Sequence, residues 1–376
     1  MTPSVADRVR EALARVHDPE IHRPVTELGM VASVDVSPAG AVRVGLLLTV
    51  SGCPLRETLR GDVVREVAAV PGVTGVEVDF GVMSEEQRRT LQQRLMGERG
   101  ARVIPFAAPG STTQVYAVAS GKGGVGKSSV TVNLAAATAR TGRTVGVLDA
   151  DVYGHSVPRM LGVRGLPTQV EQMIMPPTAY GLRVMSVGMF TAGNSPVVWR
   201  GPMLHRALEQ FLADVYWGDL DVLFLDLPPG TGDIALSVAH LIPSAQLVVV
   251  TTPQQAAAEV AERAGAVAAQ TQQRIAGVVE NMAWLGCPHC GERAEVFGAG
   301  GGASVAERLS RLLGAHVPLL GRIPLDAELR KSGDAGEPLV LASPDAPAAR
   351  ELRDVAARLA ARGRGLAGRR LKLTPR

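Results

Sequence analysis

Cysteine is scarce in this sequence, which argues against a protein that disulfide bonds hold together. The 376 residues contain three cysteines, Cys53, Cys287 and Cys290. Three are too few for a disulfide framework, so we expect a protein of the reducing cytoplasm. No apolar run approaches the roughly 20 residues that span a bilayer. Residues 1–19 contain acidic side chains and no apolar core of a signal peptide, so the sequence predicts neither a membrane anchor nor secretion.

The sequence also lacks a large excess of either charge. Lysine and arginine total 39 and aspartate and glutamate total 36, which leaves a formal net charge of +3. The isoelectric point near 8.9 reflects many arginines, several of them close to the end of the chain. This near balance gives no electrostatic reason to expect nucleic acid or a membrane surface as a partner. The length allows two domains and a sizeable core.

The first 92 residues predict a small α+β domain. Apolar residues recur at helical spacing over 4–16 and 55–70. Strand-like runs occupy 30–36, 42–48 and 73–80, with a turn at 37–40. Part of 84–96 is expected to form a helix. A linker over residues 93–112 is expected because this stretch is rich in residues that break helices and strands.

Residues 113–365 predict a larger α/β domain. Short apolar strands alternate with helices, which favours a mostly parallel sheet covered by helices on both faces. The expected strands are 115–119, 144–148, 183–187, 222–225, 246–251, 275–279 and 317–323. The expected helices are 129–140, 203–217, 304–313 and 347–361, with a surface loop at 332–338 and a basic tail at 366–376. Ligands of such sheets bind at the carboxyl ends of the strands.

A complete phosphate-loop motif lies between the first strand and the first helix of this domain. Gly121 is followed, after four residues, by Gly126-Lys127-Ser128. In this motif Lys127 reaches the β and γ phosphates of ATP, and the Ser128 hydroxyl holds Mg²⁺. A glycine-rich turn that matches by chance is the alternative, and the flanking strand and helix argue against it. The expected nucleotide contacts are Gly121, Lys122, Gly123, Gly124, Val125, Gly126, Lys127, Ser128 and Ser129.

Polar residues follow three of the expected strands. Asp226 ends the strand 222–225, a Walker B arrangement in which the carboxylate holds Mg²⁺ directly or through water. Asp149 and Asp151 follow the strand 144–148. Asn281 follows the strand 275–279, where its side chain is expected to hydrogen-bond the adenine edge. For each aspartate the alternative is a helix N-cap.

Lys122 is a second lysine within the phosphate loop, and it cannot easily reach the phosphates of its own site. It resembles the signature lysine of the deviant Walker A ATPases, the group of MinD, ParA, the nitrogenase iron protein and the Mrp/ApbC carriers. The resemblance implies a homodimer in which Lys122 of each chain completes the ATP site of the other. It also implies that Asp149 and Asp151 are the extra acidic pair of the group, one of which orients or deprotonates the attacking water; we favour Asp151. The alternative for Lys122 is a solvated surface lysine.

Cys287 and Cys290 form a Cys-x-x-Cys pair in a tight turn. Two thiolates at this spacing can ligate one metal centre, but a complete site normally needs four ligands. Two-fold symmetry provides four thiolates if the loop lies on the axis of a dimer, which suits a bridging [4Fe–4S] cluster. The competing interpretations are structural zinc with His289 as a further ligand, a redox dithiol, and a chance occurrence of the motif.

Six motifs occur in order along the chain. They are 122–128, Asp149 to Gly154, 199–203, Asp226 to Asp233, Asn281-Met282 and 287–290. Together they are similar to the Mrp/ApbC family of iron–sulfur cluster carrier ATPases. The resemblance implies a slow ATP hydrolase of the cytoplasm that receives clusters from assembly scaffold proteins and delivers them to apoproteins. It also implies adenine rather than guanine as the base. His155 departs from the family, which commonly has proline there.

The first domain resembles the small domain that accompanies iron–sulfur assembly ATPases. The matching residues are 18–20, 27–31 and 51–54. Cys53 lies in the last of these, where it is either a transient metal ligand or an ordinary small buried residue.

Two other functions remain open at this point. One is a positioning ATPase of the MinD/ParA kind, which needs a membrane-binding helix or a DNA-binding surface. The other is a dimeric ATPase stapled by zinc.

Overall fold

The chain folds into two compact units. The structure, a computed structural model, describes residues 4–49, 55–96, 103–108, 110–151, 154–190, 201–230, 233–254, 265–287 and 289–361. The first unit comprises Met1–Ala101 together with Thr168–Met175, and the second comprises Arg102–Pro167 and Pro176–Arg376. Among the described residues, no helix has the length and apolar character needed to cross a membrane.

The first unit is built on a three-stranded sheet of order β1-β2-β3. The first two strands are antiparallel, and β3 pairs with β2 in parallel. Ser4 and Asp7 form a capping box that fixes the start of the first helix. The elements are α1 (Val5–Leu13), β1 (Val31–Val36), β2 (Ala41–Leu48), α2 (Arg56–Ala68), β3 (Gly75–Val82) and α3 (Glu85–Met96).

A short hairpin from the middle of the sequence completes this unit. It consists of β6 (Thr168–Val170) and β7 (Met173–Met175), which pair antiparallel. All residues of β7 are buried, and Arg88 of α3 pairs with Glu171 in the hairpin turn at 3.0 Å. Because these strands are so short, no periodic pattern predicts them from the sequence.

The second unit contains an eight-stranded sheet of order β15-β12-β11-β4-β10-β5-β9-β8. All neighbours are parallel except β8 and β9. The strands are β4 (Gln114–Ser120), β5 (Val145–Asp149), β8 (Thr178–Ala179), β9 (Leu182–Ser186), β10 (Val222–Asp226), β11 (Gln246–Thr251), β12 (Arg274–Glu280) and β15 (Leu319–Arg322). The fold class predicted from the sequence is confirmed: a mostly parallel sheet with helices, and a small α+β domain before it.

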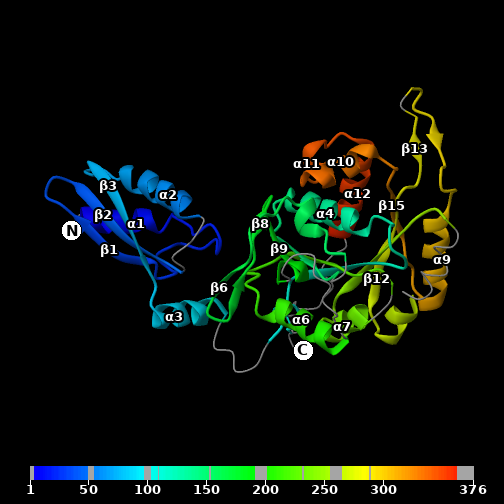
Figure 1. Cartoon of the computed structure of the whole chain (residues 1–376), viewed down its shortest axis with the longest axis horizontal. Helices are drawn as coiled ribbons and strands as arrows, with labels where there is room; N and C mark the ends of the chain where they lie inside the picture. Colours follow the sequence, from blue (N-terminus) through cyan, green and yellow to red (C-terminus); the bar gives the residue numbers. More distant parts are fainter. Residues whose placement is uncertain are drawn as a thin grey trace, which may run out of the picture. The chain divides into compact units, whose positions relative to one another are not determined.

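Helices cover both faces of this sheet (Figure 1). One face carries α4 (Lys127–Ala139), α10 (Ala327–Ala335), α11 (Leu339–Ala342) and α12 (Pro347–Ala361). The other face carries α6 (Gly201–Ala213) and α7 (Asp233–Leu241). A second hairpin, β13 (Leu285–Gly286) with β14 (Arg293–Ala294), projects beyond the sheet (Figure 1). The remaining elements are α5 (Val157–Met160), α9 (Gly301–Leu313) and the short 3-10 helices Pro105–Ala107 and Val187–Phe190.

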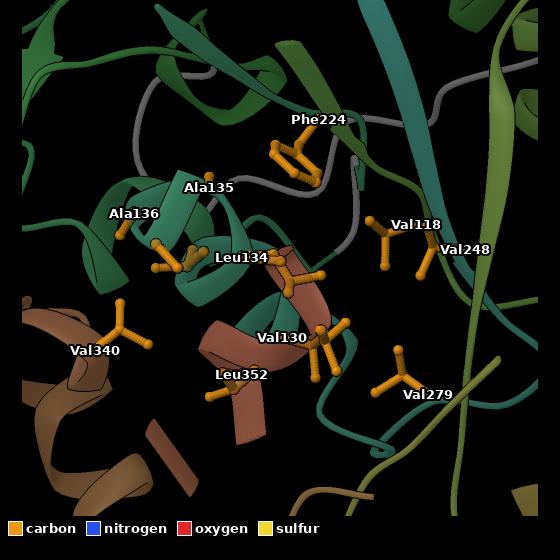
Figure 2. Packing of buried hydrophobic residues seen from close by; sticks show 14 of the residues in the cluster. Val118, Val130, Leu134, Ala135, Ala136, Phe224, Val248, Val279, Val340 and Leu352 are labelled. Carbon is orange, nitrogen blue, oxygen red and sulfur yellow. The ribbon is translucent and has the colours of Figure 1, made fainter. Parts of the chain in front are cut away.

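The core lies between the sheet and the α4 and α12 helices. Figure 2 shows Val130 and Leu134 of α4 beside Leu352 of α12 and facing strand residues such as Val279. These side chains are at most 1% exposed. Burial of α4 on nearly all sides fixes the helix on which the phosphate loop ends, so the core holds the loop in place.

Two sequence predictions are wrong, and both concern glycine. Residues 332–338 were expected as a surface loop, but α10 extends to Ala335. Asp326 caps its start through a 2.9 Å bond from the Glu328 amide, and Gly336 ends it with a φ of 79°. The helix expected over 304–313 begins three residues earlier, at Gly301, as α9. Any side chain at 301 would collide with the Pro253 carbonyl, so a close approach of the backbone explains that glycine.

Candidate functional site

The phosphate loop joins β4 to α4 as the sequence predicts. Helix α4 starts at Lys127, two positions earlier than expected, so the motif itself forms the helix N-terminus. Gly124 and Gly126 adopt φ values of 78° and 79°, the left-handed region that favours glycine. The loop amides and the positive end of the helix dipole are therefore placed to bind phosphate.

Asp226 is fully buried at the end of β10, surrounded by residues of the loop and of α4. The Lys127 ammonium lies 2.7 Å from its Oδ2 atom, and the Ser128 hydroxyl donates to the same oxygen at 2.6 Å. The Thr131 hydroxyl lies 2.7 Å from Oδ1. The carboxylate and the Ser128 hydroxyl are hard oxygen donors side by side, which is the donor set that Mg²⁺ prefers. These two residues fit a magnesium site.

Asp149 lies opposite Asp226 in the register of β5 and β10, and it is fully buried. Burial, and next the charge of Asp226, raise the pKa of Asp149 to about 8. The carboxyl group accepts hydrogen bonds from the amides of Asp151 and Val157 at 3.1 and 3.2 Å. It therefore holds the backbone of the loop after β5.

Asp151 is itself buried, with 7% of its surface exposed. Its Oδ1 atom accepts a 2.9 Å hydrogen bond from the amide of Gly154. Because Asp149 holds its backbone in place, Asp151 is presented at the same edge of the sheet as the phosphate loop.

Lys122 has a partner within its own chain. Its ammonium donates to Oε1 of Gln254 at 2.6 Å. Gln254 follows the end of β11 by three positions. Both side chains are on the surface.

Asn281 connects β12 to the phosphate loop. Its side-chain amide donates to the carbonyl oxygen of Val125 at 2.9 Å, and a side chain at Gly126 would collide with it. Its Oδ1 atom is buried and is without a partner among the described residues. Asn281 thus offers a fixed acceptor beside the nucleotide loop.

Cys287 and Cys290 lie on the projecting β13–β14 hairpin, half-buried and exposed respectively. Backbone amides of Cys290 and then His289 hydrogen-bond the Cys287 sulfur and lower the pKa of its thiol. Amides directed at sulfur stabilise a thiolate, the form that binds metal. A groove of about 650 Å³ borders Cys287 and is lined also by Trp284, Leu325 and Pro347.

Several predicted residues lie outside the described part of the chain. They include Cys53, the tryptophan and arginine at 199 and 200, and the tail 366–376. Conversely, Thr131 and the Glu280–Arg322 pair were not singled out from the sequence. Thr131 carries a signal that could have found it, because it follows Lys127 by one helical turn on the same face.

Comparisons with known proteins agree with this geometry. Residues 111–360 match the family described as NUBPL iron-transfer P-loop NTPase, and residues 6–79 match that described as iron-sulfur cluster assembly protein. The chain is 62% identical over 367 residues to an iron-sulfur cluster carrier protein of Mycobacterium tuberculosis, covering 98% of this chain and 96% of the relative. It is 40% identical to that of Bacillus subtilis over 330 residues, covering 85% of this chain and 88% of the relative.

A solved structure is also similar to part of the chain. It is a nucleotide-binding protein of Archaeoglobus fulgidus in complex with ADP, at 38% identity and a TM-score of 0.52, covering 59% of this chain and 86% of that one. From the phosphate loop, the small first unit and the extent of these matches, the chain belongs to the iron–sulfur cluster carrier family of P-loop NTPases.

Proposed function

We propose that two copies of this chain hold a [4Fe–4S] cluster as cargo between their Cys287 and Cys290 thiolates and transfer it to apoproteins. ATP binding and hydrolysis gate the transfer. The observation that carries this proposal is the short distance along the chain from Asn281, bonded to the phosphate loop, to Cys287 on the projecting hairpin. Nucleotide and cargo sites are therefore parts of one continuous segment.

The residues around Asp226 have different roles in nucleotide binding and hydrolysis. The loop amides and Lys127 bind the phosphates, and Ser128 and Asp226 hold Mg²⁺, which neutralises phosphate charge when bound. Asp151 orients the attacking water and takes its proton. Asp149 keeps the Asp151 loop in place. We expect slow hydrolysis, because its role is to time release of the cluster.

The unpartnered Oδ1 of Asn281 supports adenine as the base. The exocyclic amino group of adenine is a donor and matches this acceptor, whereas guanine has an acceptor at the same position. Because the amide nitrogen is already bonded to Val125, the side chain cannot turn over to suit guanine without losing that bond.

Pairing of two chains would complete both sites. One chain supplies two thiolates on the hairpin, half of the usual ligand set of a cluster. Leu285, Val296 and Phe297 on and beside the hairpin are exposed apolar side chains, which suits an interface. In the dimer Lys122 crosses to the ATP site of the other chain. We expect a cytoplasmic protein that takes clusters from scaffold proteins and delivers them to client apoproteins.

The decisive experiment replaces Cys287 and Cys290 with serine and measures iron and sulfide after anaerobic reconstitution. Wild-type protein should be brown, with a broad visible band, and the double variant colourless with ADP binding unchanged. Cys53→Ser is the matched control and should still load the cluster. Normal loading of the double variant would refute the proposal. A colourless wild-type protein that contains zinc would support the zinc-stapled ATPase instead. ATP-dependent pelleting with lipid or DNA would support a positioning ATPase.

A further inference from the structure

Backbone hydrogen bonds anchor the segment from Asn281 to Cys287 at three of its first four residues. The backbone N–H of Asn281 donates to the carbonyl oxygen of Thr251 at 2.8 Å, and the backbone N–H of Ala283 donates to the carbonyl oxygen of Ile323 at 2.9 Å. The carbonyl oxygen of Trp284 accepts from Leu325 at 2.7 Å. Such a segment has little slack, so a shift at Asn281 is passed along the chain and not absorbed by a flexible loop.

Glu280, the residue before Asn281, is a fully buried carboxylate. Its Oε1 atom lies 2.7 Å from Nε of Arg322, and its Oε2 atom accepts a 2.6 Å hydrogen bond from the backbone N–H of Gly302. A buried charge needs such partners, because its desolvation is otherwise uncompensated. The position of the Arg322 guanidinium is therefore tied to that of Glu280, and through the backbone to that of Asn281.

Arg322 also covers one of the faces of Trp284, which is 9% exposed. The guanidinium carbon of Arg322 lies 5.5 Å from the ring centroid, and that of Arg293 lies 4.3 Å from it. Arg293 belongs to β14 and pairs with Gly286, the residue before Cys287. The Trp284 ring is thus held by one arginine from the sheet and one from the cysteine hairpin.

We propose that Arg322 and Trp284 are positioning residues that transmit the nucleotide state from Asn281 to the Cys287 and Cys290 thiols. This inference rests on the proposed function, in which nucleotide gates release of the cluster. A base that engages Asn281 shifts Glu280, Arg322 follows its buried partner, and the contact with Trp284 changes. The hairpin then moves relative to the sheet. A planar guanidinium can bind a carboxylate and stack on indole at once, which an ammonium cannot do equally well.

The test measures thiol reactivity in cluster-free protein, so it does not depend on the cargo. In a Cys53→Ser background, the rate of labelling by Ellman's reagent reports only Cys287 and Cys290. We expect Mg·ADP to change this rate at least about fivefold in the parent protein, the lower end of typical allosteric coupling. In Arg322→Lys and in Trp284→Leu the change should fall below about twofold. ADP affinity should be retained in both variants.

Two further variants serve as controls. Trp284→Phe keeps an aromatic face for the arginines and should retain most of the nucleotide effect. Arg311→Lys makes the same chemical change on α9, where the side chain is exposed and pairs with Glu307, and should behave like the parent. The proposal would be overturned if labelling of the parent protein did not depend on nucleotide, or if Arg322→Lys and Trp284→Leu both kept the full nucleotide effect. A change caused only by dimer formation would persist in those variants and would also overturn it. Failure of the proposed cargo would appear separately, as absence of iron and sulfide in the reconstituted wild-type protein.

Discussion

The Lys127 ammonium lies 2.7 Å from Oδ2 of Asp226, the same oxygen that accepts the Ser128 hydroxyl. Mg²⁺ that arrives without nucleotide must compete with this buried ammonium. ATP phosphates draw the lysine away and bring further oxygen ligands, so nucleotide and Mg²⁺ should bind cooperatively.

Lys127→Met removes this ammonium. The variant should bind Mg²⁺ in the absence of nucleotide at least about tenfold more tightly, because a buried positive charge this close to the carboxylate opposes the metal by a few kcal/mol. The same variant should lose ATP binding. Isothermal titration calorimetry measures both, with Lys331→Met, an exposed lysine on α10, as control. An unchanged Mg²⁺ affinity would show that the pair does not oppose the metal.

Thr131 orients the carboxylate of Asp226 through its hydroxyl, 2.7 Å from Oδ1. Thr131→Val keeps the shape of the side chain and removes the donor. We expect Mg·ADP affinity to fall about 10- to 100-fold, the usual effect of removing a partner of a metal ligand. ADP binding without Mg²⁺ should change little, and Thr131→Ser should restore the wild-type value.

The matched control is Thr138→Val on the same helix. Thr138 donates to the Leu134 carbonyl at 2.7 Å, away from Asp226. If both valine variants weaken Mg·ADP equally, the effect comes from the helix and not from orientation of the carboxylate.

In the dimer that we propose, Lys122 has to leave Gln254 to reach the other chain, so the Lys122–Gln254 contact should oppose dimer formation. A hydrogen bond from a charged group on the surface contributes about 1 kcal/mol. Because dimer formation breaks this contact in both chains, Gln254→Ala should tighten the ATP-bound dimer by roughly 30-fold in sedimentation experiments. Gln254→Glu should weaken the dimer, because the contact becomes an ion pair. Weaker pairing of the alanine variant would contradict this role.

Asp149 should make stability depend on pH. Its pKa is raised from 3.8 in the unfolded chain to about 8 in the fold. Between these values the folded state binds the extra proton, so the free energy of unfolding should fall as pH rises from about 4 to about 8. One proton gives at most about 1.4 kcal/mol per pH unit. Asp149→Asn should flatten the profile measured by urea unfolding without nucleotide, and an unaltered slope would exclude Asp149 as its source.

Much of the site could be predicted because its motifs are local. Gly121 to Ser128 lie within one strand–loop–helix unit, and Asp226 directly ends an apolar strand. The role of Asp149 was harder to foresee: spacing groups it with Asp151, but its burial and its bonds to backbone amides depend on packing.

Other contacts depend on the order of strands in the sheet, which the sequence does not give. Thr131 and Asp226 are 95 positions apart, and Lys122 and Gln254 are 132 apart. The hairpin at 168–175 belongs to the first unit through tertiary packing alone. In α10 the cap at Asp326 and the left-handed Gly336 outweigh the poor helix propensity of Ser332 and Gly333.

Native mass spectrometry of anaerobically reconstituted protein can show whether two chains share one cluster, as we propose. We expect a dimer that carries one group of four irons and four sulfides, and a cluster-free, unpaired chain when Cys287 and Cys290 are both serine. A single chain that holds the complete cluster, or a dimer with one cluster in each chain, would contradict it.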